Sequence, residues 1–109
     1  MKPKDLFETK LPSNLKGQGD ALTKINAIFQ FNISGDNGGS WWVDCTKSGG
    51  EVGSGNNSGA TCTVTMKDST FDAMTEGKLS GQEAFMTGQI KLQGNMMLAM
   101  QLGKVLGLQ

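Results

Sequence analysis

Side chains that could perform covalent chemistry are scarce in this chain of 109 residues, because it contains no histidine. A Ser-His-Asp triad and a Cys-His pair both use an imidazole as the general base, so this chain can form neither. Zinc and iron sites built on imidazole are excluded for the same reason, and two cysteines cannot complete a four-thiolate site. Acid–base catalysis would fall to aspartate, glutamate or lysine. We therefore expect no enzyme activity, no metal and no other cofactor.

The two cysteines are the strongest nucleophiles that remain. Cys45 and Cys62 fall on the predicted inner faces of two strands that we expect to be adjacent. Cysteines in such positions are usually small buried apolar side chains, so we expect free thiols. A redox-linked disulfide is the alternative if the register of the strands places the two residues opposite each other.

The remaining motifs favour structural roles. Gly53–Ser58 resembles the start of a dinucleotide fingerprint, but its sixth residue is serine and it lies between two predicted strands, which indicates a turn. Asp44 lies in a strand and Asp68 at a helix start, which indicates surface charge and helix capping. No pattern brings the two carboxylates together.

Methionine is the distinctive residue type in the second half of the chain, where Met66, Met74, Met86 and the segment Met96–Met100 follow one another. Methionine is unbranched and polarizable, and it adapts to irregular shapes. An ordinary core is one explanation. The hypothesis that we favour is a deformable apolar interior that accommodates an apolar ligand.

The elements that must position these residues begin with a helical segment. Lys4–Lys10 has helical character, with Leu6, Phe7 and Leu11 as candidate anchors. Pro12 is expected to break the helix or to restart it, with Ser13 as the N-cap of a second short helix.

A two-residue period then predicts strands at 27–34, 40–46 and 61–67, with a short strand near Glu51-Val52. The predicted inward residues are Ala27, Phe29, Phe31, Ile33, Trp41, Val43, Cys45, Cys62, Val64 and Met66. Turn-rich connections favour an antiparallel meander with one wet face. Trp42 lies on the outer face as a partly exposed aromatic or, alternatively, as an anchor for contact with a membrane.

The period becomes helical after Lys67. We expect a helix at 68–76 capped by Asp68 or Ser69. A second helix should start at Ser80 or Gly81 and run through Thr87, with Ala84 and Phe85 inward. A return strand at 89–94 and a largely apolar terminal helix at 96–106 follow. This order predicts a single α+β domain over residues 1–109, with helices layered on one face of the sheet.

Composition limits the partners. The formal net charge is zero and arginine is absent, which argues against a nucleic-acid partner. No apolar run is long enough to span a membrane, and the first residues lack the apolar stretch of a secretory signal. We expect an intracellular monomer.

Five passages together resemble the sterol carrier protein 2 family, the non-specific lipid-transfer proteins. They are Ser40–Asp44 (SWWVD), Ala60–Met66 (ATCTVTM), Gly77–Leu79 (GKL), Ala84–Gly88 (AFMTG) and Gln89–Met96 (QIKLQGNM). The similarity runs in the same order from about Leu15 to Leu106 and is particularly close from Ala60 to Leu102.

The resemblance implies a roughly five-stranded mixed sheet covered on one face by helices, with an apolar tunnel between the layers. It implies binding of fatty acids, fatty acyl-CoA, sterols and phospholipids, transfer of these lipids through transient membrane contact, and an association with peroxisomal β-oxidation enzymes. An alternative role is a domain that presents substrate to such an enzyme. The chain ends in Gly107-Leu108-Gln109 rather than a peroxisomal tripeptide, so cytoplasmic and peroxisomal locations both stay open.

The residues that we expect to line the lipid site are apolar, with two glutamines near its entrance. They are Phe29, Phe31, Ile33, Trp41, Val43, Phe71, Met74, Phe85, Met86, Met100 and Leu102, with Gln82 and Gln101 as the polar pair.

Overall fold

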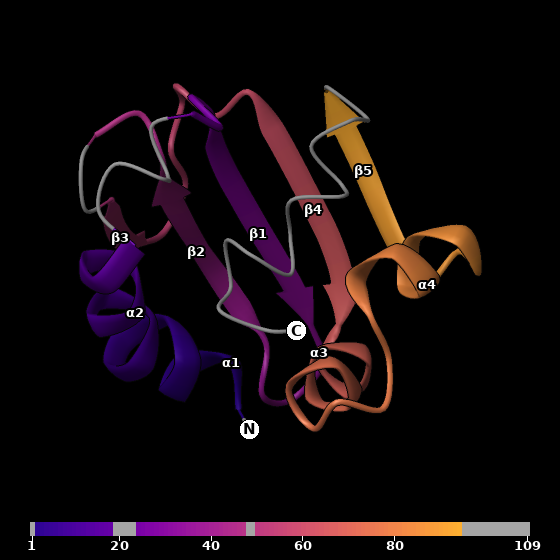
Figure 1. The fold of residues 1–109 in the computed structure, drawn as a ribbon. Helices are drawn as coiled ribbons and strands as arrows, with labels where there is room; N and C mark the ends of the chain where they lie inside the picture. The colour runs from indigo at the N-terminus through magenta and orange to yellow at the C-terminus, as the bar shows by residue number, and fades with distance from the viewer. Residues whose placement is uncertain (1, 19–23, 48–49, 95–109) are drawn as a thin grey trace.

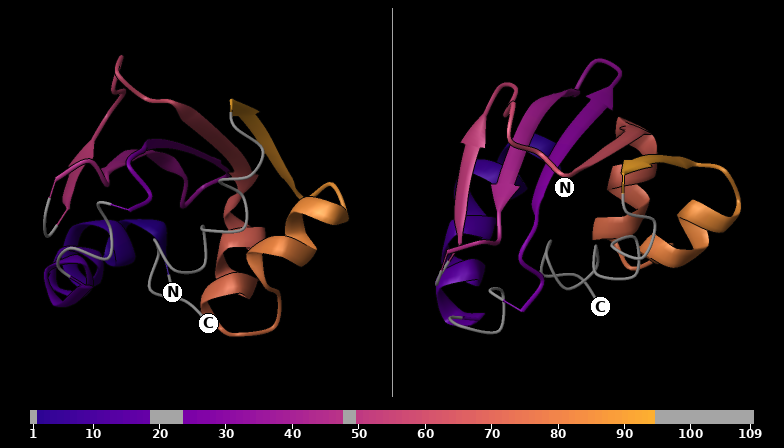
Figure 2. Two further views of the ribbon diagram at one scale, coloured as in Figure 1. Left: turned by 45° about the horizontal axis from the view of Figure 1, so that its top comes forward. Right: turned by 90° about the horizontal axis from the view of Figure 1, so that it is seen from above.

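A five-stranded sheet carries helices on one of its faces (Figure 1; Figure 2). This computed structural model describes residues 2–18, 24–47 and 50–94. The strands are β1 (Ile28–Ser34), β2 (Gly39–Asp44), β3 (Glu51–Ser54), β4 (Cys62–Lys67) and β5 (Ile90–Gly94). The helical segments are α1 (Pro3–Asp5), the π-helical turn η1 (Leu6–Lys10), α2 (Leu11–Gln18), α3 (Asp68–Thr75) and α4 (Gly81–Met86). The predicted α+β class and the single helical layer are confirmed.

The order of the strands, β3-β2-β1-β4-β5, corrects one prediction. The antiparallel meander consists of β1, β2 and β3, because β3 occupies the edge of β2 that the strand at 61–67 was expected to take. That strand, β4, lies on the other side of β1 and runs parallel to it. The final strand β5 is antiparallel to β4, so the sheet is mixed.

The inner face of the sheet follows the predicted alternation. Its ten predicted inward residues, from Ala27 to Met66, are all at most 5% exposed. In the register, Phe31 lies between Trp41 of β2 and Val64 of β4. The three central strands thus present one continuous apolar surface to the helices.

Gln30 departs from the expected wet outer face, because it is only 5% exposed. Its Nε2 donates to the carbonyl oxygens of Trp41 (3.2 Å) and Gly55 (2.9 Å), and its Oε1 accepts from the backbone N–H of Asn57 (2.7 Å). The amide therefore holds the connection between β3 and β4 against the outer face of β1. A buried amide is stable there because its polar atoms have partners.

The first helical region is continuous, so the predicted break at Pro12 is wrong. Proline removes one helical N–H and crowds the carbonyl four residues earlier. The π-helical turn directly before it is wider, and the N–H of Leu11 bonds to the carbonyl of Leu6 across that turn. As a result Leu6, Phe7 and Leu11 are all buried, as predicted for anchors.

The two later helices begin and end near their predicted limits. The N-cap of α3 is Lys67, so the predicted capping by Asp68 or Ser69 is wrong. The second helix, α4, starts at Gly81 as predicted, and Ser80 caps it, since its Oγ accepts from the N–H of Glu83 at 3.1 Å. Gly77 and Gly88 follow the two helices with φ of +77° and +80°, which glycine adopts without a steric penalty. The terminal helix predicted at 96–106 lies outside the described residues.

No helix among the described segments is long and apolar enough to cross a membrane.

The expectation that Cys45 and Cys62 lie on adjacent strands is wrong. The N–H of Cys45 bonds to the carbonyl of Ala27 on one side of β1, whereas Cys62 pairs with Phe29 on the other side. Two strand spacings, roughly 9.5 Å, separate their backbones, and a disulfide needs Cα atoms closer than about 7 Å. Both residues are buried free thiols.

We predict slow thiol chemistry in the native protein. Burial, and then the Asp44 carboxylate, raise the pKa of Cys45 to about 11, and burial raises the pKa of Cys62. The reactive thiolate is therefore rare at neutral pH, and its fraction should rise about tenfold per pH unit until the pH nears the raised pKa. The rate of labelling with a chromogenic disulfide should rise with pH in the same proportion as the thiolate fraction. It should increase strongly when denaturant unfolds the protein. Native labelling as fast as that of free cysteine would contradict the burial.

The Gln30 contacts predict a stability effect. Gln30→Met should lower the free energy of unfolding by about 1–3 kcal/mol, because Gly55 and Asn57 lose partners. The control, Gln93→Met, replaces an exposed glutamine on β5. It should change the free energy of unfolding by less than about 0.5 kcal/mol. Equal effects in urea denaturation would show that the Gln30 contacts do not stabilise the fold.

Candidate functional site

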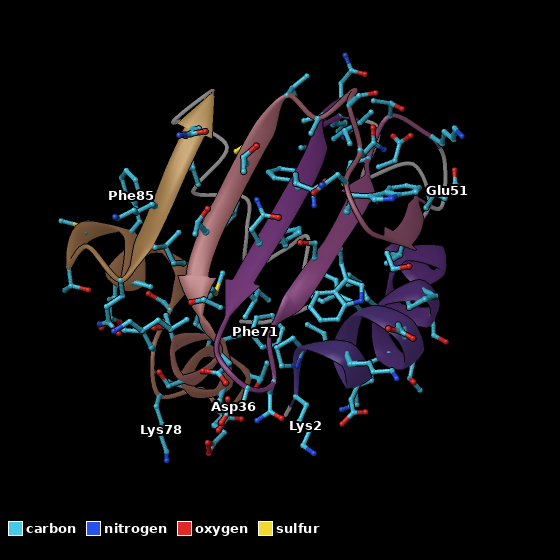
Figure 3. The ribbon with its side chains drawn as sticks, turned by 180° about the vertical axis from the view of Figure 1, so that it is seen from behind. Lys2, Asp36, Glu51, Phe71, Lys78 and Phe85 are labelled. Carbon is cyan, nitrogen blue, oxygen red and sulfur yellow. The ribbon has the colours of Figure 1, made fainter. Side chains whose placement is uncertain are left out.

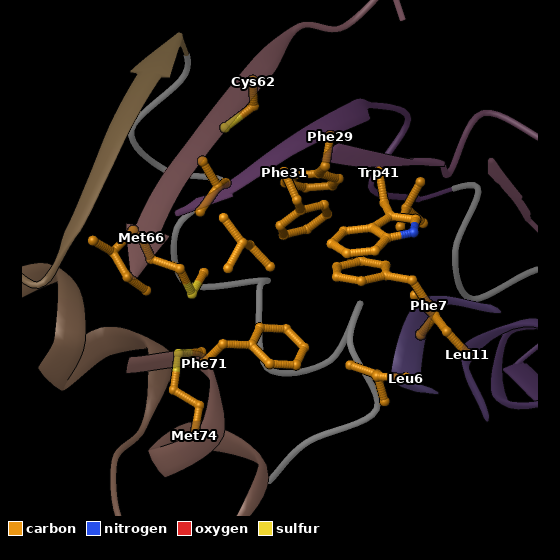
Figure 4. Close-up of a cluster of buried hydrophobic side chains, with 14 of the residues drawn as sticks. Leu6, Phe7, Leu11, Phe29, Phe31, Trp41, Cys62, Met66, Phe71 and Met74 are labelled. Carbon is orange, nitrogen blue, oxygen red and sulfur yellow. The ribbon is translucent and has the colours of Figure 1, made fainter. Parts of the chain in front are cut away.

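Five aromatic side chains meet between the sheet and the helices, and we call them the aromatic cluster: Phe7, Phe29, Phe31, Trp41 and Phe71. Phe7 is central. Its ring lies 5.1 Å from that of Trp41 with an interplanar angle of 7°, 5.1 Å from Phe31 and 5.6 Å from Phe71 (Figure 4). These contacts join η1, β1, β2 and α3 through one side chain.

The orientation of Trp41 has two local causes. Its Nε1–H donates to Oε2 of Glu8 at 3.2 Å, which satisfies the one polar atom of the ring. Its ring also lies over Gly39, where a Cβ would stand 2.7 Å from Cη2. Glycine at 39 therefore lets the indole lie flat toward η1.

Trp42 is half-buried on the outer face and covers Gly53 of the neighbouring strand. A Cβ at Gly53 would lie 2.3 Å from Cζ2 of Trp42, so the ring occupies the space that a side chain would fill. Covering a strand glycine with an aromatic ring stabilises a sheet edge. Trp42 thus has a packing role, and a role as a membrane anchor stays a prediction.

Next to the aromatic cluster the interior becomes aliphatic and sulfur-rich. Met66 of β4 and Met74 of α3 are each 3% exposed and lie on the same side of the cluster (Figure 4). Val64 and Ile90 from the sheet and Ala84 from α4 are buried with them. The interior therefore grades from rigid rings near the first helical region to flexible thioethers near the later helices.

Seven of the predicted lining residues belong to this buried set: Phe29, Phe31, Ile33, Trp41, Val43, Phe71 and Met74. Phe85 is half-buried beside β5, at the far edge of the sheet (Figure 3). Met86 is 74% exposed, so the expectation that it faces the interior is wrong. It is the last residue of α4, and the helix presents Ala84 to the core instead.

The other predicted residues are not placed. Met100, Leu102 and Gln101 lie outside the described residues, and of Gln82 only its backbone position in α4 is described.

Phe7 is the main residue that the predicted lining omits. The sequence marked it as an anchor of the first helix together with Leu6 and Leu11, but gave no sign that it meets β1, β2 and α3. Met66 and Val64 were predicted to face inward and belong with the same buried set.

The carboxylates considered for catalysis are engaged elsewhere. Asp44 accepts hydrogen bonds from the backbone and hydroxyl of Thr46. Asp68 accepts from the N–H groups of Asn37 (3.1 Å) and Ser69 (2.8 Å), so it ties the turn between β1 and β2 to α3. Within the described part of the chain, no three of the residue types His, Cys, Asp and Glu are grouped so that they could hold a metal ion.

A cavity of about 540 Å³ lies beside the contact between Asp68 and Asn37, between α1, the β1–β2 turn and α3. Lys2, Asp5, Asp68 and Asp72 contribute its charged groups. None of the aromatic cluster lines it, so it is separate from the apolar interior.

The chain resembles proteins of known sequence over most of its length. The model of the SCP-2 sterol transfer family matches residues 7–107. A fatty acid-binding protein of Yarrowia lipolytica is 40% identical over 93 residues, which cover 81% of this chain and 71% of that protein. Hydroxysteroid dehydrogenase-like protein 2 of Bos taurus is 39% identical over 88 residues, covering 80% of this chain. The match spans only 21% of that longer protein.

A solved structure has the same fold. The solution structure of palmitated SCP2L2 from Aedes aegypti gives a TM-score of 0.78 at 25% identity, with 97% of this chain and 95% of that chain covered. Since the family model covers nearly the whole chain and the Yarrowia relative is matched over more than two thirds of its length, this chain belongs to the SCP-2 sterol transfer family.

Proposed function

We propose that this chain binds single lipid molecules in an apolar space between the sheet and the helices, and transfers them between membranes or to enzymes. Fatty acids, fatty acyl-CoA, sterols and phospholipids are the lipid classes in question. Membership of the SCP-2 sterol transfer family supports this function, as do the fatty acid-binding relative and the palmitate carried by the relative from Aedes aegypti.

The observation that carries the proposal is the composition of the interior. Rings and thioethers supplied by both layers face one another, and Phe7, Phe71 and Met74 come from the helical side. Such side chains offer an acyl chain or a sterol dispersion contacts without hydrogen bonds. Selectivity among apolar ligands would therefore be loose.

The magnitudes agree with a carrier rather than a permanent holder. Each buried CH₂ gains roughly 0.8 kcal/mol, so about a dozen methylenes of a fatty acid gain roughly 10 kcal/mol in all. Association costs of about 4–15 kcal/mol offset much of this gain. A lipid would thus bind and still be released to a membrane, which supplies an alternative apolar phase.

The proposed lining consists of the seven buried residues of the predicted set together with Phe7 and Val64. Met86 is not included, because its side chain faces solvent. Phe85, Met100, Leu102, Gln82 and Gln101 stay predictions. We further propose that the chain is not itself catalytic and that it acts as a monomer that touches membranes transiently.

A second role has one observation in its favour. The chain corresponds to about a fifth of a hydroxysteroid dehydrogenase-like relative, so a domain of this type occurs within a longer protein. Presentation of a lipid substrate to an enzyme is therefore compatible with the same binding site.

Filling the interior tests the proposal. Val64 is fully buried on the inner face of β4, beside Phe31 of β1. If a lipid normally occupies space there, Val64→Phe should lower affinity for a fluorescent fatty acid about tenfold or more while the lipid-free protein loses less than about 1 kcal/mol. In a fully packed core without a ligand site, the same change would lower the free energy of unfolding by about 1–3 kcal/mol.

The matched control is Thr63→Phe, the same new side chain on the outer face of the same strand. It should leave displacement of the probe by palmitate unchanged. A wild-type protein that ignores the probe, with Val64→Phe strongly destabilised, would contradict a lipid site in this interior.

A further inference from the structure

A second cavity, of about 460 Å³, lies between the end of β4, where the chain turns into α3, and the start of β5. None of the aromatic cluster lines it. Its polar lining comes from Ser34, Thr65, Lys67, Ser69, Thr70, Gln89 and Lys91. We call it the lysine cavity.

Alternation along the strands places the polar strand residues of this lining on the outer face of the sheet. Ile33, Val64 and Met66 face inward, so Ser34, Thr65 and Lys67 face outward. In the register, Lys67 pairs with Ser34, and Lys91 pairs with Thr65. These polar strand residues thus lie on the opposite face of the sheet from the apolar interior, whereas Met66 and Thr70 contribute buried walls to the lysine cavity.

The charge of this cavity has one sign. Lys67 and Lys91 line it, and no aspartate or glutamate does. They are diagonal neighbours across the β4–β5 pair, at a typical separation of about 7–8 Å. Asp68 is next in sequence, but its carboxylate bonds to Asn37 and lines the other cavity. An anion between the two ammonium groups would relieve their repulsion.

Thr70 is the second observation that points to a ligand. It is only 6% exposed, it lines the lysine cavity, and its hydroxyl forms no hydrogen bond with any residue in the described ranges. Buried hydroxyls normally have partners, because an unmade bond costs about 1–3 kcal/mol. A ligand oxygen in the cavity would supply the acceptor.

We propose that the lysine cavity binds a phosphate group, with Lys67 and Lys91 as charged donors and the Thr70 hydroxyl as a buried neutral donor. The other hydroxyls of the lining and the Gln89 amide supply further donors. A phosphate fits this set because it offers several acceptor oxygens to separate donors. The group could come from a phospholipid headgroup or from a soluble phosphate compound, and neither source requires the apolar interior to hold a lipid.

Titration of the ¹⁵N-labelled protein with inorganic phosphate tests the site. The backbone signals of Lys67, Thr70 and Lys91 should shift together and saturate. The double variant K67Q/K91Q should lower the affinity at least about tenfold, since two charge-assisted hydrogen bonds are lost. The control K47Q/K78Q removes the same charge at two exposed lysines elsewhere and should change the affinity less than about twofold. An equal loss of phosphate affinity in both double variants would overturn the proposal.

Thr70→Val separates a ligand role from a structural one. Because the hydroxyl has no protein partner within the described residues, its removal should leave the melting temperature unchanged or raised, while phosphate affinity falls about threefold or more. A lower melting temperature with unchanged phosphate affinity would show that the hydroxyl serves the fold, and would overturn its part in the site.

Vesicles distinguish the two sources. Phosphatidylcholine vesicles with and without phosphatidic acid are compared by sedimentation for the wild type and the two double variants. Retention that needs phosphatidic acid and both cavity lysines would assign the site to a phospholipid headgroup. Saturable inorganic phosphate binding without such retention would assign it to a soluble compound. If the protein neither binds inorganic phosphate nor is retained on the vesicles, the proposal is overturned.

Discussion

The packing of Phe7 against Trp41, Phe31 and Phe71 is the interaction on which the rest of the structure depends. A sheet with one apolar face is stable only when a second layer covers that face. Phe7 contacts the strands β1 and β2 and the helix α3 at once. The π-helical turn of η1 makes this contact possible, because it brings Leu6, Phe7 and Leu11 to the same side despite Pro12. The hydrogen bond from Nε1–H of Trp41 to Glu8 adds a polar link between β2 and η1.

The second constraint is the parallel pairing of β1 with β4. It places Cys45 and Cys62 on opposite sides of β1, and it requires the chain to return along the outer face, where Gln30 holds it. The same pairing brings Ser34 beside Lys67 and so creates one wall of the lysine cavity. A single topological feature thus determines both the state of the thiols and one wall of the lysine cavity.

Local patterns predicted much of this fold. The two-residue period identified the strands and their inner faces, and Ser80 and Gly77 marked helix boundaries, because these features depend on neighbours in sequence. Long-range features were missed. Nothing local shows that β3 displaces β4 from the edge of β2, that Phe7 becomes the centre of the aromatic cluster, or that Gln30 is buried. The prediction for Met86 was wrong because the pattern of a helix as short as α4 does not determine which of two neighbouring residues faces the core.

The proposed function requires that the interior between the sheet and the helices holds a lipid. Native mass spectrometry of the protein as purified tests it most directly, because a ligand held by apolar contacts leaves the apparent mass of the complex above that of the chain. We expect one lipid per protein, exchangeable for palmitate added in excess. A protein that carries no lipid and takes up none from an excess of palmitate would contradict it.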